Sequence, residues 1–309
     1  MDAVKVFAPA SVANVAVGYD VLGFAINEPG DDIILRKKGN KPLHVHSIHG
    51  VGKNIPRAIQ KNTAGLAALK VLEALGEQDM PLQMEIYKNM AIGTGLGSSA
   101  ASAVAGAMAV NELLGKPFEK KDLLPFAVAG EEIADGAWHG DNVAPSLLGG
   151  MVLVRDNQTL DFKKIHVPQG LFVSIIYPHV QIFTSDSRAV VSDIVSLKQL
   201  VSQTGNMGAF IAGMFTSDFG MIRRSLKDHV IEPQRKHLIP FYEELKDIAL
   251  QSDALGFNIS GAGPTMFALC SNNLIAENIC ERTKAFLSDK KLESDVFVSS
   301  INMEGAYRY

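Results

Sequence analysis

The chain has 309 residues, of which 47% are hydrophobic and 20% are charged. At roughly 100 to 200 residues per domain this length predicts about two domains, and the apolar fraction is sufficient for buried cores, which excludes a disordered chain. The formal net charge of −4 provides no basic excess for a phosphate backbone, so nucleic acid is excluded as an expected partner.

Short β-like runs and helical patterns alternate in the first half of the chain. We expect strands at residues 4–8, 21–26, 33–37 and 82–87, with a helix at residues 56–75 before the last of them. A strand at residues 151–154 closes this half. Strands and helices are therefore expected in one layered domain.

A glycine-rich turn, Gly93-Thr94-Gly95-Leu96-Gly97-Ser98-Ser99, precedes a helix of small residues that ends near Leu114. A second helix at 119–134 and a loop at 136–142 follow. No charged residue lies between Lys88 and Glu112, which raises the question of a membrane span. The stretch is rich in Gly, Ala, Ser and Thr instead of Leu, Ile and Phe, so we expect a loop and a helix and no membrane partner.

The second half repeats the mixture of helices and strands. A strand is expected at residues 171–177, helices at 192–214, 215–226 and 239–251, strands at 255–259 and 265–269, a helix at 274–287 and a strand at 296–301. The polar turn at 156–158 predicts a boundary between a domain of residues 1–160 and a domain of residues 161–309.

The two cysteines, Cys270 and Cys280, are too few for a disulfide framework and suit a reducing compartment. The first residues lack the basic and apolar regions of a signal peptide. The expected location is the cytoplasm.

The glycine-rich turn has the features of an anion site. Gly93, Gly95 and Gly97 can adopt positive φ and bring backbone N–H groups close to a ligand. Ser98 and Ser99 stand where the next helix directs its unpaired N–H groups, which favours phosphate. No lysine of the Walker type follows. A flexible turn with an ordinary serine cap is the alternative.

Residues 93–101, GTGLGSSAA, resemble the second signature of the family of galactokinase, homoserine kinase, mevalonate kinase and phosphomevalonate kinase. Ala91 departs from the family, which commonly has proline ahead of the loop. The resemblance implies an α+β fold with an N-terminal domain similar to domain 2 of ribosomal protein S5 and a ferredoxin-like C-terminal domain. It also implies use of ATP and Mg²⁺, with nucleotide contacts from Asn62, Gly93, Thr94, Gly95, Leu96, Gly97, Ser98 and Ser99.

Residues 9–23, 139–150, 184–188 and 232–236 resemble the homoserine-specific branch of that family. This implies phosphorylation of the side-chain hydroxyl of L-homoserine for threonine synthesis, by a homodimer as is typical of the branch. Residues 260–265 resemble the third family signature, a turn that closes the substrate site. The substrate contacts implied are Asn14, Asp20, His139, Arg188, Arg235 and Gly261.

The chemistry of these positions agrees with an amino acid substrate. Arg188 and Arg235 offer planar forks for its carboxylate. Asp20 suits its ammonium group, and Asn14 is available for its hydroxyl.

The resemblance also implies that Glu131 and Ser99 hold Mg²⁺. Glu131, Asp141 and Asn142 are the candidate catalytic residues. The sequence leaves open whether Asp141 acts as a general base or whether positioning and electrostatic stabilisation suffice.

Two other functions remain as alternatives. One is a kinase of the same family that acts on a sugar or an isoprenoid alcohol, and the other is a nucleotide-binding regulator without catalytic activity. A zinc site at His44, His46 and His49 is discounted because no cysteine or acidic ligand stands at useful spacing.

Overall fold

Two β-sheets form the framework of the protein, and the computed structural model describes residues 1–51, 55–136 and 138–309. The larger sheet has the order β11-β1-β2-β4-β3, with β5 paired to β2 and β6 paired to β5. The smaller sheet has the order β10-β7-β9-β8. The strands are β1 (Ala3–Ala13), β2 (Leu22–Pro42), β3 (His44–Gly50), β4 (Pro81–Lys88), β5 (Met151–Asp156), β6 (Asp161–Ile165), β7 (Phe172–Pro178), β8 (Gly256–Ile259), β9 (Met266–Cys270), β10 (Ser294–Ser300) and β11 (Tyr307–Arg308).

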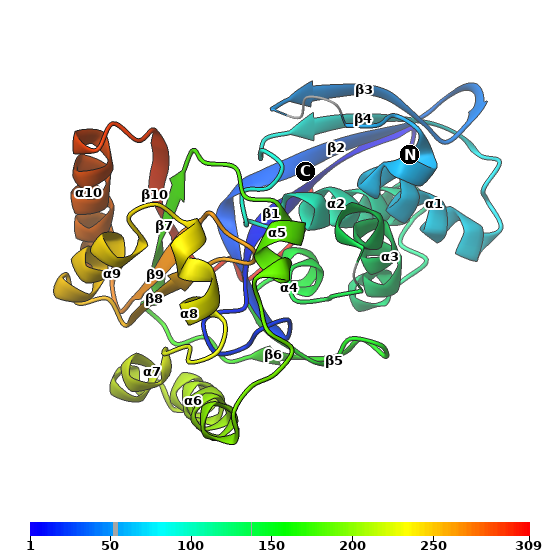
Figure 1. Cartoon of the computed structure of the whole chain (residues 1–309). Coiled ribbons are helices and arrows are strands. Elements are labelled where there is room, and N and C mark those ends of the chain that lie inside the picture. The colour runs from blue at the N-terminus through cyan, green and yellow to red at the C-terminus, as the bar shows by residue number, and fades with distance from the viewer. Residues whose placement is uncertain (52–54, 137) are drawn as a thin grey trace.

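The helices divide between the two sheets (Figure 1). Those that follow the first strands are α1 (Thr63–Leu75), α2 (Ser98–Leu113), α3 (Leu124–Asp135) and α4 (Val143–Leu148). The later ones are α5 (Thr184–Ala189), α6 (Leu197–Thr216), α7 (Phe219–Ser225), α8 (Glu232–Arg235), α9 (Tyr242–Gln251) and α10 (Asn273–Asp289). Short 3₁₀ turns cover Ile59–Lys61, Lys120–Leu123 and Lys236–Leu238.

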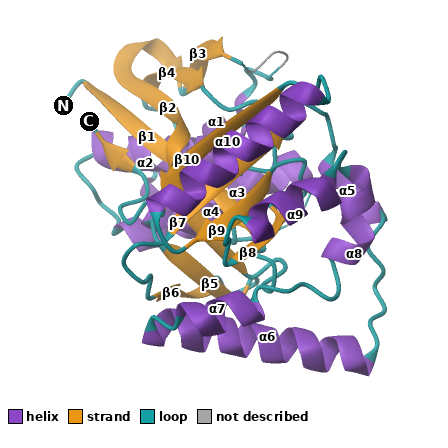
Figure 2. Ribbon diagram, turned by 90° about the vertical axis from the view of Figure 1, so that its left-hand side faces the viewer, coloured by secondary structure: helices purple, strands orange, loops and turns teal. Residues whose placement is uncertain are grey.

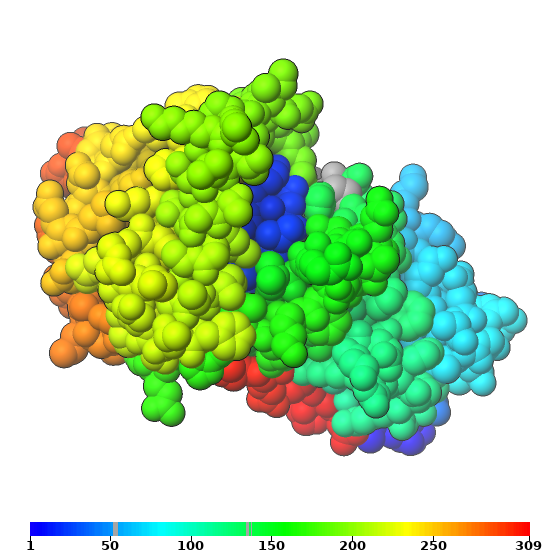
Figure 3. Space-filling view, turned by 90° about the horizontal axis from the view of Figure 1, so that it is seen from below, coloured from blue at the N-terminus to red at the C-terminus, as the bar shows by residue number. Residues whose placement is uncertain are grey.

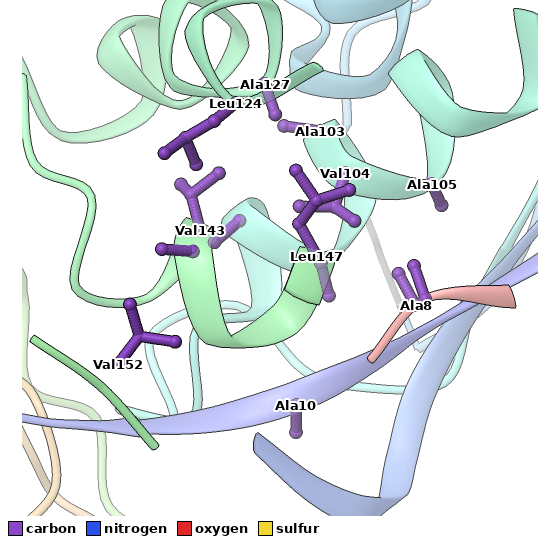
Figure 4. Packing of buried hydrophobic residues seen from close by; sticks show 14 of the residues in the cluster. Ala8, Ala10, Ala103, Val104, Ala105, Leu124, Ala127, Val143, Leu147 and Val152 are labelled. Carbon is purple, nitrogen blue, oxygen red and sulfur yellow. The ribbon is translucent and has the colours of Figure 1, made fainter. Parts of the chain in front are cut away.

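Helix α2 is the centre of the first domain. Its small side chains leave room for close neighbours, and nearly all of its residues are buried. A Cβ added at Gly106 would lie 2.2 Å from the carbonyl oxygen of Ala64 in α1, so the two helices touch through their backbones. Figure 4 shows Ala103 and Val104 of α2 among Leu124, Ala127 and Leu147. Burial in this core explains why no charged residue lies between Lys88 and Glu112. No described helix is long and apolar enough to cross a membrane.

The second sheet has the strand order of a ferredoxin-like domain. In chain order its strands are β7, β8, β9 and β10, so the spatial order β10-β7-β9-β8 is 4-1-3-2 and each neighbouring pair is antiparallel. Figure 2 shows α10 lying across this sheet. The α+β fold expected from the sequence is confirmed.

Several elements differ from the sequence prediction. The strands expected at residues 21–26 and 33–37 are one strand, β2, whose pairing with β1 shifts register between Pro9 and Ser11. The helix expected at 56–75 begins only at Thr63, where the Asn62 side chain caps it. Strand β3 and the short helices α5 and α8 were not predicted. The two helices complete fewer than two turns, which is too short for a helical period to show in the sequence.

The proposed boundary at residue 160 also differs from the pairing of the strands. Strand β6 pairs with β5 through five residue pairs, so the first sheet extends to Ile165. Strand β11 returns from the end of the chain and pairs with β1. Both contacts depend on pairing between strands, which a polar turn in the sequence does not reveal.

Candidate active site

The glycine-rich turn lies between β4 and the first turn of α2. Gly95 has φ +81° and Gly97 has φ +64°, in the left-handed region. A Cβ at Gly95 would lie 2.6 Å from the Ser260 carbonyl oxygen, and one at Gly97 would lie 2.4 Å from Ser11 Oγ. Both positions therefore require glycine for conformation and for space. The turn delivers the chain to the N-terminus of α2 at Ser98, where unpaired N–H groups favour an anion.

A single cavity brings most of the predicted site residues together. It lies where the domains meet, and Figure 3 shows residues near the N-terminus, in dark blue, between the yellow-green surface of the second domain and the green surface of the first. The predicted residues that line it are Asn14, Asp20, Gly93, Thr94, Gly95, Gly97, Ser98, Ser99, Glu131, His139, Asp141, Asn142, Arg188, Arg235 and Gly261.

One end of the cavity carries a carboxylate between an arginine and a histidine side chain. Asp20 Oδ2 lies 3.4 Å from Arg188 Nη1 and 3.8 Å from His139 Nε2. The backbone N–H of Asp20 donates to Asn14 Oδ1 at 3.0 Å, and Asn14 Nδ2 donates to the Gly261 carbonyl at 2.9 Å. The amide of Asn14 therefore fixes the loop that presents Asp20 and joins it to the second domain.

Arg235 approaches the same end from α8. Its side chain is 3% exposed, its Nε donates to the Ser187 carbonyl at 2.9 Å, and its Nη1 donates to the Gly261 carbonyl at 3.1 Å. Nη2 donates to the Tyr19 hydroxyl at 3.2 Å, and the guanidinium lies 5.1 Å from the centre of that ring. Burial is the main reason that the pKa of Tyr19 is raised and that of Arg235 lowered. A guanidinium has five N–H donors, so three bonds fix its direction and leave donors for a ligand.

The short helix that carries Arg235 is fixed by carboxylates. Asp228 accepts hydrogen bonds from the backbone N–H groups of Val230, Ile231 and Glu232. The Glu232 carboxylate is paired with Lys246 and accepts from Asn258 Nδ2 at 3.0 Å. Burial is the main reason that the pKa of Glu232 is raised. These bonds fix the start of α8, one turn before the arginine.

At the other end, Ser99 in the first turn of α2 donates from Oγ to Glu131 Oε1 in α3, at 2.7 Å. Glu131 is 8% exposed. A hydroxyl and a carboxylate are oxygen ligands of the kind that Mg²⁺ takes, and protein sites for Mg²⁺ commonly supply only one or two ligands beside a phosphate. No group of three or more His, Cys, Asp or Glu that could hold a metal occurs among the described residues. The pair fits a Mg²⁺ ion shared with phosphate.

Asp141 and Asn142 stand at the start of α4, on the cavity wall. Asp141 is 4% exposed, and Asn142 Oδ1 accepts a hydrogen bond from Ser11 Oγ at 2.9 Å. Asn142 therefore anchors the wall beside Gly97.

Two predicted nucleotide residues lie outside this cavity. Asn62 lines an adjoining apolar pocket with Ile55, Ile86, Ile92 and Ile133, and its amide caps α1 by accepting from Gly65 N at 2.9 Å. The Leu96 side chain is buried in the core, and its N–H donates to Thr94 Oγ1 at 3.3 Å within the loop.

The sequence analysis missed a buried ion pair under the glycine-rich turn. Lys88 Nζ is paired with Asp31 and also donates to the Ser98 carbonyl at 2.5 Å and to Ser102 Oγ at 2.8 Å. The side chains of Lys88 and Asp31 are 3% and 0% exposed. A lysine that ends an apolar strand next to the loop was the only signal in the sequence, since its partner is 57 residues away.

Comparison with known proteins agrees with this geometry. Residues 61–150 match the model of the GHMP kinases N terminal domain, and residues 197–289 match that of the GHMP kinases C terminal domain. A homoserine kinase of Chlorobium phaeovibrioides is 44% identical, over 99% of this chain and 99% of its own. A homoserine kinase of Xylella fastidiosa is 34% identical, over 98% and 92%.

Solved structures give the same grouping. The crystal structure of a homoserine kinase from Cytophaga hutchinsonii has a TM-score of 0.97 and 45% identity, covering 100% of this chain and 98% of that one. A mevalonate kinase of L. major, at 18% identity and a TM-score of 0.73 over 96% of both chains, shares the fold. The chain belongs to the GHMP kinases and groups within that family with the homoserine kinases.

Proposed function

We propose that the protein transfers the γ-phosphoryl group of ATP to the side-chain hydroxyl of L-homoserine and yields O-phospho-L-homoserine for threonine synthesis. The observation that carries this proposal is the position of Asp20, Arg188 and Arg235 in the same cavity as the glycine-rich turn. A zwitterion requires one anionic and one cationic partner, and these three side chains supply both within reach of a phosphate loop.

The acceptor is held by its two charged groups. Arg235 and Arg188 bind the carboxylate, and Asp20 binds the ammonium group in place of its present contact with Arg188. His139 and Gly261 complete the wall around the amino acid. Asn14 holds the loop and keeps one N–H for the hydroxyl, because only one of its two amide hydrogens is needed for the Gly261 carbonyl.

The nucleotide lies along the first domain. The adenine occupies the apolar pocket beside Asn62, and the phosphates lie against the glycine-rich turn and the hydroxyls of Ser98 and Ser99. Glu131 and Ser99 hold Mg²⁺, which neutralises charge on the phosphates when it is bound.

The chain contributes to the transfer mainly by positioning and by electrostatic stabilisation. The N–H groups at the start of α2 stabilise negative charge on the transferring group. Asp141 lines the cavity. It accepts the proton of the acceptor hydroxyl when that hydroxyl lies within hydrogen-bond reach. Asn142 holds the cavity wall in place through its hydrogen bond with Ser11. The enzyme is proposed to act as a cytoplasmic homodimer, with no nucleic acid or membrane partner.

The test is release of ADP from ATP and Mg²⁺ with L-homoserine, D-homoserine, L-serine, mevalonate and galactose as acceptors. We expect strong selectivity for L-homoserine, because the two arginines and Asp20 fix the configuration of the amino acid. Turnover with mevalonate or galactose alone would agree with membership of the family and would refute L-homoserine as the substrate. Binding of ATP without stimulation by any acceptor would favour a regulator.

The carboxylate contact predicts the effect of Arg235→Ala. We expect the KM for L-homoserine to rise by more than about tenfold, equivalent to about 1.4 kcal/mol, while the Kd of ATP changes little. Arg223→Ala is the matched control, because Arg223 is about half exposed and pairs with Asp253 on the surface. Steady-state kinetics gives the KM for homoserine, and isothermal titration calorimetry gives the Kd of ATP, for both variants at the same fraction of folded protein. An unchanged KM for homoserine in Arg235→Ala would show that this arginine does not bind the acceptor.

A further inference from the structure

A turn of the second domain is bonded directly to the glycine-rich turn of the first. Ser260 Oγ donates to the Gly95 carbonyl at 2.7 Å. The Thr265 N–H donates to the Thr94 carbonyl at 3.2 Å. Ser260 is fully buried, and Gly95 leaves no space between the two turns for a Cβ. The shape of the glycine-rich turn therefore depends on the position of Ser260.

The same turn of the second domain is bonded to the acceptor end of the cavity. The Gly261 carbonyl accepts from Arg235 Nη1 at 3.1 Å and from Asn14 Nδ2 at 2.9 Å. The Gly261 N–H donates to the Ala13 carbonyl at 3.2 Å. Gly261 follows Ser260 directly in the chain, so a single peptide unit separates the contacts of the acceptor site from those of the phosphate loop.

We propose that Ser260 is a positioning residue that couples binding of the amino acid acceptor to binding of the nucleotide. A carboxylate that binds Arg235 holds the Gly261 carbonyl in place, and the Ser260 hydroxyl then holds the Gly95 carbonyl in the conformation that directs the loop N–H groups at phosphate. Ser260 is not one of the residues that line the cavity, so it acts through Gly95. This inference rests on the proposed function, since it takes homoserine as the ligand of Arg235.

The expected signature is a coupling between two ligands. Isothermal titration calorimetry gives the Kd of AMP-PNP with Mg²⁺ in the absence and presence of saturating L-homoserine. For the wild-type protein we expect homoserine to tighten this Kd about tenfold, within the usual range for coupled sites. In Ser260→Ala we expect an effect of less than about twofold, because the bond to the Gly95 carbonyl is lost. The backbone bond from Thr265 to Thr94 remains but does not hold that carbonyl.

Two further variants separate coupling from folding. Ser260→Cys keeps nearly the same shape with a weaker donor, and we expect an intermediate coupling. Ser225→Ala removes another buried hydroxyl of the second domain, one whose bond among the described residues is to the Ile222 carbonyl of its own helix, at 3.0 Å. We expect this control to keep the full wild-type coupling, although it also loses a buried hydrogen bond. A loss of coupling in Ser260→Ala and in Ser225→Ala alike would overturn the specific role of Ser260.

The result also distinguishes this inference from the proposed function. Wild-type coupling retained in both Ser260 variants would overturn the inference. A wild-type protein that phosphorylates homoserine without any coupling would also overturn it and would leave the proposed function intact. A wild-type protein that neither binds nor phosphorylates homoserine would refute the proposed function and the inference together.

Discussion

Replacing Glu131 by Gln is expected to lower kcat with Mg²⁺ by about 100-fold or more, the usual scale for loss of one electrostatic contact to a transferring group. The amide keeps the shape of the side chain and its hydrogen bond with Ser99 Oγ, now 2.7 Å long to the carboxylate, but removes the negative charge. The Mg²⁺ concentration for half-maximal activity should therefore rise. The KM for homoserine should change little, because Glu131 lies at the Ser99 end of the cavity. Initial rates over a Mg²⁺ titration measure these quantities.

Glu132→Gln is the matched control for this prediction. Glu132 is the next residue of α3, has the same side chain and is exposed. Its replacement should leave kcat and the Mg²⁺ dependence within about twofold of the wild type, since exposed charges interact weakly. Near-normal turnover in Glu131→Gln would show that residues other than Glu131 hold the metal.

Replacing Lys88 by Met is expected to lower the free energy of unfolding by about 3 to 5 kcal/mol, the usual loss when one partner of a buried ion pair is removed. Asp31 would remain buried, with hydrogen bonds only from Ser102 Oγ and the Asn89 N–H as compensation among the described residues. Urea denaturation followed by circular dichroism measures the change. The first turn of α2 should also loosen, because Lys88 donates to the Ser98 carbonyl.

A second variant and a surface control test the cause of that loss. Adding Asp31→Asn to Lys88→Met removes the uncompensated charge and should restore a large part of the stability. Lys70→Met breaks the exposed pair of Lys70 with Glu73, which should cost less than about 1 kcal/mol. A loss in Lys88→Met no larger than in Lys70→Met would show that the buried pair does not hold this part of the fold.

The local sequence was sufficient for the elements and residues whose chemistry depends on near neighbours. Glycines at positions 93, 95 and 97 followed by two serines identified the anion-binding turn, and the structure gives all three glycines positive φ. The glycine-rich turn and the run of small residues after it located α2, and periodicity located α10 and most strands of both sheets. These features require only backbone conformation and a short range of residues, so they are readable without the fold.

The assignment of substrate residues relied on resemblance, since an isolated arginine or aspartate has no local signature. Arg188 and Asp20 are 168 residues apart in the chain and 3.4 Å apart in space. The structure places both in the cavity with Arg235. Their assignment as ligands of homoserine stays a prediction that the Arg235→Ala kinetics address.

Only the tertiary structure decided which groups contact one another when they lie far apart in the chain. The pairing of Lys88 with Asp31, the bond from Ser260 to Gly95 and the return of β11 to β1 all join segments that are far apart in the chain. The first and the third depend on the strand order of the first sheet, and the second depends on the approach of the two domains. A hydrogen bond requires a separation of about 3 Å that no spacing in the sequence encodes. The sequence by itself therefore determined the phosphate-binding turn, most helices and strands, and the family to which its motifs correspond. The packing determined how that turn is connected to the acceptor site.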